Sequence, residues 1–276
     1  MAARCRRKSW AGDFILAGLI ALMGFPLLWM LLTALKSSSE IYKLPVRILP
    51  RKLKWGNFTA VWSALPFARL YLNSVFVALV VVAGQLLTSS AAGYVFAKVR
   101  FPGRDYIFAF YMLTYCIPDH VLIIPSFFLL NKFGLLNTYG GLTLPFLASP
   151  FGAFLMRQQF LDLPRELEEA AAIDGCGPLR LIAYVLLPAL RQGLGALAVY
   201  VFIFSWNGFF WPLIMTSSAS MQTLPLGLAF FQSAEAENWP VLMAAACLVS
   251  APVMLAVNRL QKALAEPGPK SFPVPR

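Results

Sequence analysis

Charged side chains and histidine are scarce in this chain of 276 residues. Only 13% of the residues are charged, and His120 is the only histidine. Soluble proteins carry about 25% charged residues, so a chain this poor in charge is not an ordinary soluble domain. A lone histidine with no paired serine motif also makes an intramembrane enzyme remote, because such an enzyme needs both a nucleophile and a base.

Paired cysteines and a phosphate-binding loop are also missing. Cys5, Cys116, Cys176 and Cys247 are far apart and form no Cys-x-x-Cys pair, which argues against a metal cage or a disulfide framework. The sequence Gly-x-x-x-x-Gly-Lys-Ser/Thr does not occur, so the chain has no recognisable nucleotide cradle of its own. If transport here is driven by ATP, a partner must hydrolyse it.

Apolar residues are abundant instead, at 59% of the chain with a mean hydropathy of +0.69. A helix needs about 20 mostly apolar residues to cross the hydrocarbon layer. The predicted fold class is therefore all-α, a polytopic membrane protein with six transmembrane helices. We expect tails at 1–10 and 263–276 around a membrane domain at 11–262, whose first span is too long for a removed signal peptide. The six predicted spans cover about 11–35, 71–97, 106–130, 140–160, 190–215 and 239–262.

The net charge of +11 does not indicate nucleic acid, because the basic residues lie in short loops between spans, where they set topology. Their overall distribution favours both chain ends in the cytoplasm. The loop 36–70 argues against this orientation, because its basic residues outnumber those of the N-terminal tail. The basic residues of this loop are Lys36, Lys43, Arg47, Arg51, Lys52, Lys54 and Arg69.

A polar, helix-forming segment at about 161–190 interrupts the apolar spans. Pro164 and the glutamates that follow it are typical of a helix start, and Gly175 is the natural left-handed stop. A second start follows at Gly177-Pro178, and the helix is expected to run until Pro188 resets the chain into the fifth span. The pattern predicts two short helices joined by a sharp bend; on local chemistry alone, this is equally a plain structured loop.

The segment 163–175, with the thirteen-residue step from Gly175 to Pro188, resembles the cytoplasmic EAA loop of membrane subunits of binding-protein-dependent ABC importers. The chain is similar in particular to carbohydrate-type permease subunits, typified by the second membrane subunit of the maltose importer. One departure is Cys176-Gly177, where the family usually has Ala and a small polar residue; the extra glycine is expected to loosen the turn. Weaker matches are Thr33-Ala34-Leu35-Lys36, Asn73-Ser74, Ala91-Ala92-Gly93-Tyr94, Ile123-Ile124-Pro125, Gly134-Leu135-Leu136-Asn137-Thr138, Trp206-Asn207 and Trp211-Pro212.

The resemblance implies a role for each part of this segment. The bent helix pair would dock in a groove of an ATP-hydrolysing subunit, with Glu169 facing basic or amide groups of that partner. Ala170 and Ala171 would form the small contact surface, Gly175 would be the bend, and Asp174 would cap or bridge locally.

The resemblance also implies the partners and the location. They are a second, similar permease subunit, a dimer of ATPases that holds ATP and Mg, an extracytoplasmic solute-binding protein, a sugar substrate and membrane lipid, in the bacterial inner membrane. This chain itself would be no enzyme and would carry no cofactor or metal.

Two groups of residues within the spans are candidates for the substrate pathway. Tyr200, Phe204, Asn207 and Trp211 recur at helical steps on one face of the fifth span, and aromatic faces with an amide suit a sugar. Packing or an interfacial aromatic belt explains the same stripe.

The second candidate is the pair Asp119-His120, between Pro118 and Pro125 of the third span. Ionisable groups at membrane depth are costly and usually face a cavity or a partner. The flanking prolines also fit a broken helix near the outer surface, with the pair simply hydrated. The same two residues are the only candidates for the ion site that a secondary transporter would need.

Between the fifth and sixth spans, the outer loop 216–238 contains Gln222, Thr223, Leu224 and Pro225. In the importers that the chain resembles, this connection contacts the binding protein. The loop 36–70 either lies on the membrane surface or meets the same binding protein. The scarcity of Lys and Arg within the spans favours a neutral sugar, with glycerol-3-phosphate or a related polyol as the alternative.

Overall fold

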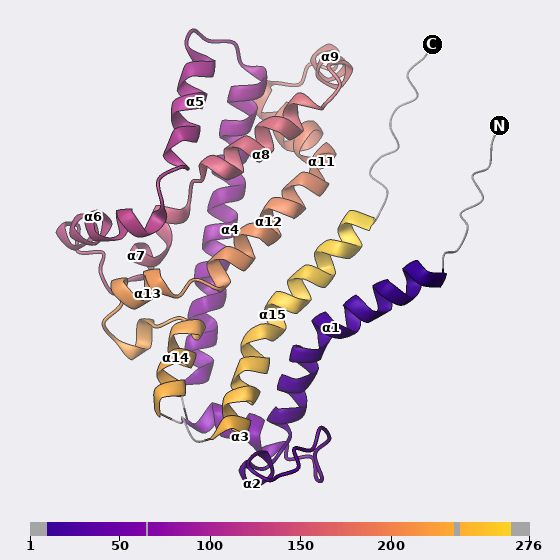
Figure 1. Ribbon diagram of the computed structural model, residues 1–276. Coiled ribbons are helices and arrows are strands. Elements are labelled where there is room, and N and C mark those ends of the chain that lie inside the picture. Colours follow the sequence, from indigo (N-terminus) through magenta and orange to yellow (C-terminus); the bar gives the residue numbers. More distant parts are fainter. Residues whose placement is uncertain (1–9, 65, 235–237, 266–276) are drawn as a thin grey trace. The chain divides into compact units, whose positions relative to one another are not determined.

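The computed structural model describes residues 10–64, 66–234 and 238–265, and all secondary structure in these ranges is helical (Figure 1). The predicted all-α fold class is therefore confirmed for the described residues. The first half of the chain contains α1 (Trp10–Ala34), α2 (Ser38–Ile41), α3 (Gly56–Ala64), α4 (Phe67–Lys98), α5 (Arg104–Thr114), α6 (Asp119–Lys132), α7 (Tyr139–Thr143) and η1 (Leu144–Phe146). The second half contains α8 (Pro150–Leu161), α9 (Glu166–Ile173), α10 (Pro178–Arg180), η2 (Leu181–Leu186), α11 (Leu187–Ala189), α12 (Arg191–Trp206), α13 (Phe210–Met215), η3 (Ala219–Met221), α14 (Leu224–Ala234) and α15 (Trp239–Ala265).

Three of these helices, α1, α4 and α15, are long and apolar enough to cross a membrane without a break. Three further candidate spans are bent pairs of helices: α5 with α6 at 92°, α7–η1 with α8 at 43°, and the segment 178–189 with α12 at 80°. The breaks fall where local chemistry stops a helix. Pro118 precedes α6, and Ser149 caps α8 by accepting a hydrogen bond from the Gly152 amide, with Pro150 in its first turn.

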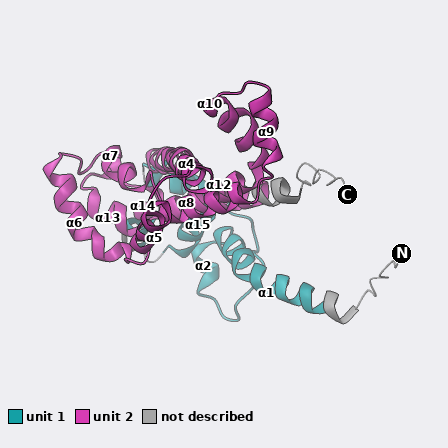
Figure 2. Cartoon of the chain, turned by 90° about the horizontal axis from the view of Figure 1, so that it is seen from above, with its two compact units in different colours: residues 1–67, 228–250 teal, residues 68–227, 251–276 magenta. Residues whose placement is uncertain are grey.

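The chain divides into two compact units, shown in different colours in Figure 2. One unit comprises residues 1–67 and 228–250, and the other comprises residues 68–227 and 251–276. The predicted N-terminal tail falls outside the described residues, apart from Trp10 in α1. Helix α15 continues to Ala265, three residues into the predicted C-terminal tail, and the rest of that tail also lies outside the described residues.

The core of the larger unit lies where α4, α8 and α12 pack together. Gly93 in α4 faces α8 so closely that a Cβ atom there would lie 2.6 Å from the Met156 Cβ and 2.8 Å from the Arg157 backbone nitrogen. Only glycine fits at this crossing, because backbone atoms cannot move aside as a flexible side chain can. The buried core residues are Val77, Val81, Ala97, Leu130, Leu142, Met156, Phe160, Leu186, Leu190, Leu197, Val201 and Met215.

Within the loop 36–70, residues 36–57 form a folded part of the smaller unit. The Lys36 side chain is buried, donates a hydrogen bond to the Arg47 carbonyl at 2.6 Å, and lies 4.7 Å from the Trp29 ring centre. The Asn57 amide donates to the carbonyls of Ala34 and Lys36. These bonds hold the loop beside the end of α1, and the bond from Asn57 to Ala34 satisfies the last carbonyl of this helix.

Glu40 fixes a second point of this loop. Its carboxylate accepts hydrogen bonds from the backbone amides of Arg51, at 2.9 Å, and Ser37. The bond from the Arg51 amide, followed by the one from Ser37, lowers the pKa of the Glu40 carboxyl below its ordinary value of 4.5.

Candidate functional site

The EAA-like segment forms a helix that ends as the sequence predicts. In α9, Asp174 ends the helix and Gly175 takes the left-handed conformation at φ 74°. The Cys176 amide donates to the Ala171 carbonyl at 2.9 Å, and the Gly175 amide donates to the Ala172 carbonyl at 3.1 Å. These two bonds define a Schellman motif, so α9 stops at a left-handed Gly175.

The extra glycine does not loosen this turn, because Gly177 has φ −69° and the two bonds that close the turn are present. Pro178 then occupies the first turn of α10, as predicted, and the helix continues through the π-helical η2 into α11. The continuation corrects one expectation. Pro188 lies inside α11, and the 80° break to α12 comes at Leu190, whose ψ of 15° leaves the helical region.

The helices α9 and α10 project from the rest of the larger unit (Figure 2). Glu169, Ala170 and Asp174 are exposed, as a contact surface requires. Ala171 does not fit its predicted contact role in this conformation, because it is only 6% exposed and faces the chain's own interior.

Larger apolar side chains of the segment are exposed instead. Ile173 is 87% exposed, Leu179 82% and Tyr184 79%. Exposed apolar residues gathered on one projecting segment indicate a surface that a partner covers.

An ion pair connects α9 to the end of α4. The Lys98 ammonium lies 2.6 Å from Glu168 Oε1, with the two side chains 13% and 26% exposed. Lys98 also donates to the Leu163 carbonyl at 3.4 Å, just before α9 begins. The first turn of α9 is therefore held by α4 and not only by its own chain neighbours.

The loop after α13 is held by two asparagine side chains of the larger unit, Asn137 and Asn73. The side-chain oxygen of Asn137 accepts hydrogen bonds from the backbone amides of Ser217 and Ser218 at 3.1 Å. At the start of α4, the Asn73 amide donates to the carbonyls of Ser220 and Gln222, both at 2.8 Å.

The structure corrects the predicted binding-protein contacts. Thr223 is 4% exposed and Leu224 is 1% exposed, because the Leu224 amide donates to the Ser74 hydroxyl and the loop turns inward there. Gln222 and Pro225 are half-buried, and the exposed residues lie earlier in the loop, at 217, 219 and 220. Residues 235–237, which include the two acids of this loop, lie outside the described residues.

The fifth span does not place all four candidate pathway residues on one helix face. Helix α12 ends at Trp206, Asn207 is its C-terminal cap, and Trp211 belongs to the separate helix α13. The Trp211 indole donates to the Gly141 carbonyl at 3.0 Å, and its ring packs edge-on against Phe146. Trp211 therefore packs within the protein, and the single-face prediction is wrong because the helix breaks at 207–209.

Two of the remaining pathway candidates, Tyr200 and Asp119, lie at or beside the break between α5 and α6. The ring centre of Tyr115, at the end of α5, lies 6.1 Å from that of Phe151 in α8. The Phe151 ring centre lies 4.6 Å from that of Tyr200. Tyr200 is partly exposed, and Asp119 is exposed at the start of α6.

Helix α6 also contacts α13. The His120 ring packs edge-on against the ring of Phe210, the first residue of α13, with 5.5 Å between the ring centres. Asn207 is exposed at the neighbouring break. Phe204 is also partly exposed and lies 6.2 Å from Phe146. Irregular backbone at membrane depth is tolerated where it lines a water-filled cavity, so these breaks are the part of the chain most suited to a polar substrate.

Comparison with known proteins decides the family. Residues 85–266 match the profile of the family described as "binding-protein-dependent transport system inner membrane component". The chain belongs to this family. It is a membrane permease subunit of an ABC importer, and the predicted identification is confirmed.

Two curated permeases of this family illustrate the similarity. The sn-glycerol-3-phosphate transport system permease protein UgpE of Pectobacterium atrosepticum is 34% identical over 256 residues, with 90% of this chain and 91% of that protein covered. The arabinooligosaccharides transport system permease protein AraQ of Halalkalibacterium halodurans is 34% identical over 253 residues, with 90% of each chain covered.

A solved structure shows the same fold. It is the crystal structure of a bacterial ABC transporter involved in the import of the acidic polysaccharide alginate. The match has a TM-score of 0.81 and 23% identity, and it covers 95% of this chain and 98% of that one.

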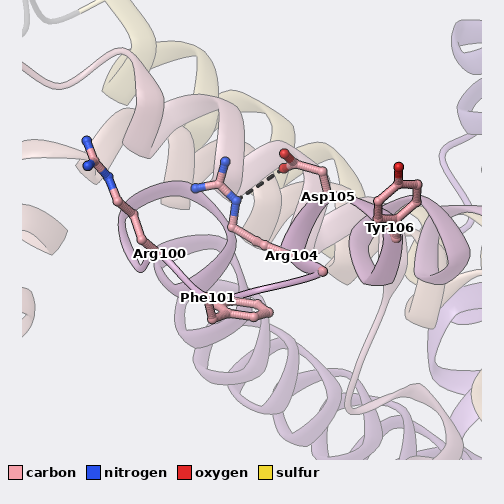
Figure 3. A pocket seen from close by; sticks show the side chains of 6 residues that line it. Arg100, Phe101, Arg104, Asp105 and Tyr106 are labelled. Carbon is pink, nitrogen blue, oxygen red and sulfur yellow. Dashed lines mark hydrogen bonds and ion pairs between the residues drawn. The ribbon is translucent and has the colours of Figure 1, made fainter.

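The permease also carries a basic pocket that the sequence prediction did not include. Figure 3 shows this pocket of about 330 Å³, where the Arg104 Nε donates to Asp105 Oδ1 at 3.1 Å. Arg157 from α8 lies 3.8 Å from the same Asp105 oxygen and stacks over the Phe108 ring. The pocket is lined by Arg100, Phe101, Gly103, Arg104, Asp105 and Tyr106.

The sequence did not predict that Lys98 pairs with Glu168 or that Asn73 holds the loop after α13. It also did not predict the exposure of Ile173. A basic residue at the end of a predicted span is an ordinary topology signal, so Lys98 gave no reason to expect a partner 70 positions later. Ile173 belongs to the EAA-like motif, and an isoleucine beside a predicted helix end in a polar segment is itself a signal of surface exposure.

Proposed function

We propose that this permease forms one half of the translocation pathway for a sugar, and that α9 and α10 transmit ATP hydrolysis by a partner to the membrane helices. The projecting, partly apolar surface of α9 and α10 carries this proposal. Glu169 and Ile173 are one helical turn apart, so they share a face of α9, and both are exposed.

The partner that fits this surface is an ATP-hydrolysing subunit with a groove. Its basic or amide groups would meet Glu169, and its apolar side chains would cover Ile173, Leu179 and Tyr184. ATP and Mg would be bound by a dimer of these subunits, because this chain has no phosphate-binding loop. Each of the two permeases of the complex would dock on one of them.

We infer six spans, with each bent pair counted as one, and both chain ends in the cytoplasm. The basic pocket beside the α4–α5 turn supports this orientation, since arginine collects on the cytoplasmic side of membrane proteins. A reporter active only outside the cytoplasm should be silent when fused at Arg276 and active when fused at Ala219. The reverse pattern would show that the basic loop 36–70 determines the orientation.

The second permease and membrane lipid would cover the apolar helix α1. The large apolar side chains of α1 are mostly exposed within this chain, including Phe14, Ile20 and Met23. Such a helix needs hydrocarbon or another helix around it.

The extracytoplasmic binding protein would meet the outer loop at residues 217–222. This surface is displaced from the predicted one, because Thr223 and Leu224 are buried. The loop 36–70 is a second candidate for the same partner or for the membrane surface, since Tyr42, Leu44 and Trp55 are exposed on it.

For the substrate, the groups at the α5–α6 break favour an uncharged sugar. Tyr115, Phe151 and Tyr200 offer aromatic faces, which suit sugar rings. Residues 106–131 and 192–215 contain no lysine or arginine, and Asp119 would repel an anion.

Glycerol-3-phosphate is the second candidate, because several similar permeases carry that name. The experiment is uptake of labelled sugars and of glycerol-3-phosphate by the complete importer. Competition by a neutral sugar alone supports the first candidate, and competition by glycerol-3-phosphate alone supports the second.

The coupling role is tested by Glu169→Lys, which should abolish uptake while the complex still inserts. Asp162→Lys, an exposed charge reversal just before α9, is the matched control and should leave uptake unchanged. Normal transport by a well-expressed Glu169→Lys variant would remove Glu169 from the docking surface.

A further inference from the structure

Helix α4 is the one described span within residues 68–227 that has no break. It runs without interruption for 32 residues, from Phe67 to Lys98, whereas the other candidate spans of this unit are bent by 43° to 92°. At 1.5 Å per residue its length is about 48 Å, against a hydrocarbon layer of about 30 Å. Helix α4 is therefore longer than the hydrocarbon layer is thick, so part of it extends beyond that layer.

At one end, α4 is fixed to the segment that carries α9. Lys98 pairs with Glu168 and donates to the Leu163 carbonyl, at 2.6 and 3.4 Å. Two residues earlier, the Phe96 carbonyl accepts a hydrogen bond from Arg157 Nε at 3.2 Å. Because Gly93 leaves no space between the α4 and α8 backbones, α8 and α4 cannot slide past each other freely at this end.

At the other end, α4 is fixed to the loop after α13. The Asn73 side chain is 1% exposed and uses both of its polar atoms. Its amide donates to the Ser220 and Gln222 carbonyls at 2.8 Å, and its oxygen accepts from the Tyr139 hydroxyl at 2.7 Å. Ser74 adds a hydrogen bond of 2.7 Å from the Leu224 amide. Each bond satisfies a polar group that would be costly to leave unpaired when buried.

We propose that α4 connects the two docking surfaces of this chain, so that seating of the binding protein on the outer loop reaches the ATPase through one continuous helix. Lys98 and Asn73 are positioning residues at its two ends. Hinges lie at a few loop or element-terminal residues, and α4 has no break along its length at which such a hinge could form. The inference rests on the proposed docking of an ATPase on α9 and α10 and of a binding protein on residues 217–222.

The test uses the purified four-component complex in proteoliposomes, with ATP hydrolysis measured with and without the loaded binding protein. Asn73→Ala and Lys98→Glu should each reduce the stimulation by the binding protein at least about fivefold, which is the lower end of typical coupling between sites. The hydrolysis rate without binding protein should remain. The double variant Lys98→Glu with Glu168→Lys should restore stimulation, since it remakes the ion pair with reversed charges.

A third variant interrupts α4 without touching either end. Leu87 lies near the middle of the helix and is 73% exposed, so Leu87→Pro breaks the helix while both sets of contacts remain. It should also lose stimulation, and Leu87→Ala should not. Arg100→Glu and Asn131→Ala are matched controls for the end variants, because both side chains are exposed.

The outcomes separate this inference from the proposed function. If the unmodified complex shows no stimulation by its binding protein, the proposed function fails. If it shows stimulation and both Leu87→Pro and Lys98→Glu keep it, the role of α4 is overturned. Loss of binding-protein affinity in Asn73→Ala, with full stimulation at saturating binding protein, would likewise overturn it, because Asn73 would then act only on local docking.

Discussion

Replacing Ile173 with Asp tests the coupling surface most sharply. Ile173 is 87% exposed at the end of α9, so the substitution costs this chain little packing of its own. Burying an isoleucine side chain against a partner contributes about 1.5–3 kcal/mol. Its removal should weaken ATPase binding about 10- to 100-fold, since each 1.4 kcal/mol is a factor of ten. An aspartate that must lose its water in the groove adds to this loss.

The assay is co-purification and titration of the ATPase subunit with the membrane complex in detergent. Leu44→Asp is the matched control, because Leu44 is also 87% exposed and lies in the loop between α1 and α4. We expect Leu44→Asp to bind the ATPase normally. Equal ATPase affinity for the Ile173→Asp, Leu44→Asp and unmodified complexes would refute the assignment of this surface.

Three further predictions concern packing, pH and the pathway. Gly93→Ala should lower the melting temperature of the chain, because its Cβ would meet Met156 and overpacking costs about 1–3 kcal/mol; Gly24→Ala, with open space around it, should not. The folded-state pKa of Glu40 lies below its ordinary 4.5, so its stabilising effect is present above about pH 4.5 and is lost as the pH falls through the folded pKa. Glu40→Gln should therefore speed proteolysis of loop 36–70 at pH 7, and its difference from the unmodified chain should shrink as the pH falls through the folded pKa. Asn207→Ala should lower uptake per assembled complex roughly two- to tenfold at unchanged melting temperature, as expected for a neutral hydrogen bond of about 0.5–1.5 kcal/mol.

Each of these has a clear contrary result. An unchanged melting temperature for Gly93→Ala would mean that α4 and α8 are further apart than described. A proteolysis difference for Glu40→Gln that does not shrink as the pH is lowered would separate its effect from the charge. If Asn207→Ala lowers the melting temperature and leaves uptake per assembled complex normal, Asn207 is a packing residue.

Local chemistry predicted the features that are local in the chain. The stop at Gly175 follows from a left-handed glycine after an alanine-rich turn, and the start at Pro178 follows from a residue without an N–H in the first turn. The break before Asp119 follows from Pro118. Such features depend on a few neighbouring residues, so the sequence carries them directly.

Features that depend on distant residues could not be predicted. Thr223 and Leu224 looked like an exposed loop, yet Asn73 and Ser74, some 150 positions earlier, hold this segment inward. The Trp211 prediction failed because the periodicity of residues 200–211 was extended through Asn207 as one helix. Burial of Ala171 likewise depends on tertiary packing, which a helical pattern alone does not specify.

The most direct test of the central claim is ATP-dependent uptake by the reconstituted importer. Proteoliposomes that contain this permease, its partner permease and the ATPase dimer should accumulate labelled substrate only with ATP on the ATPase side and loaded binding protein on the other. Accumulation driven by an ion gradient without ATP, and abolished by Asp119→Asn, would contradict the account and make the chain a secondary transporter.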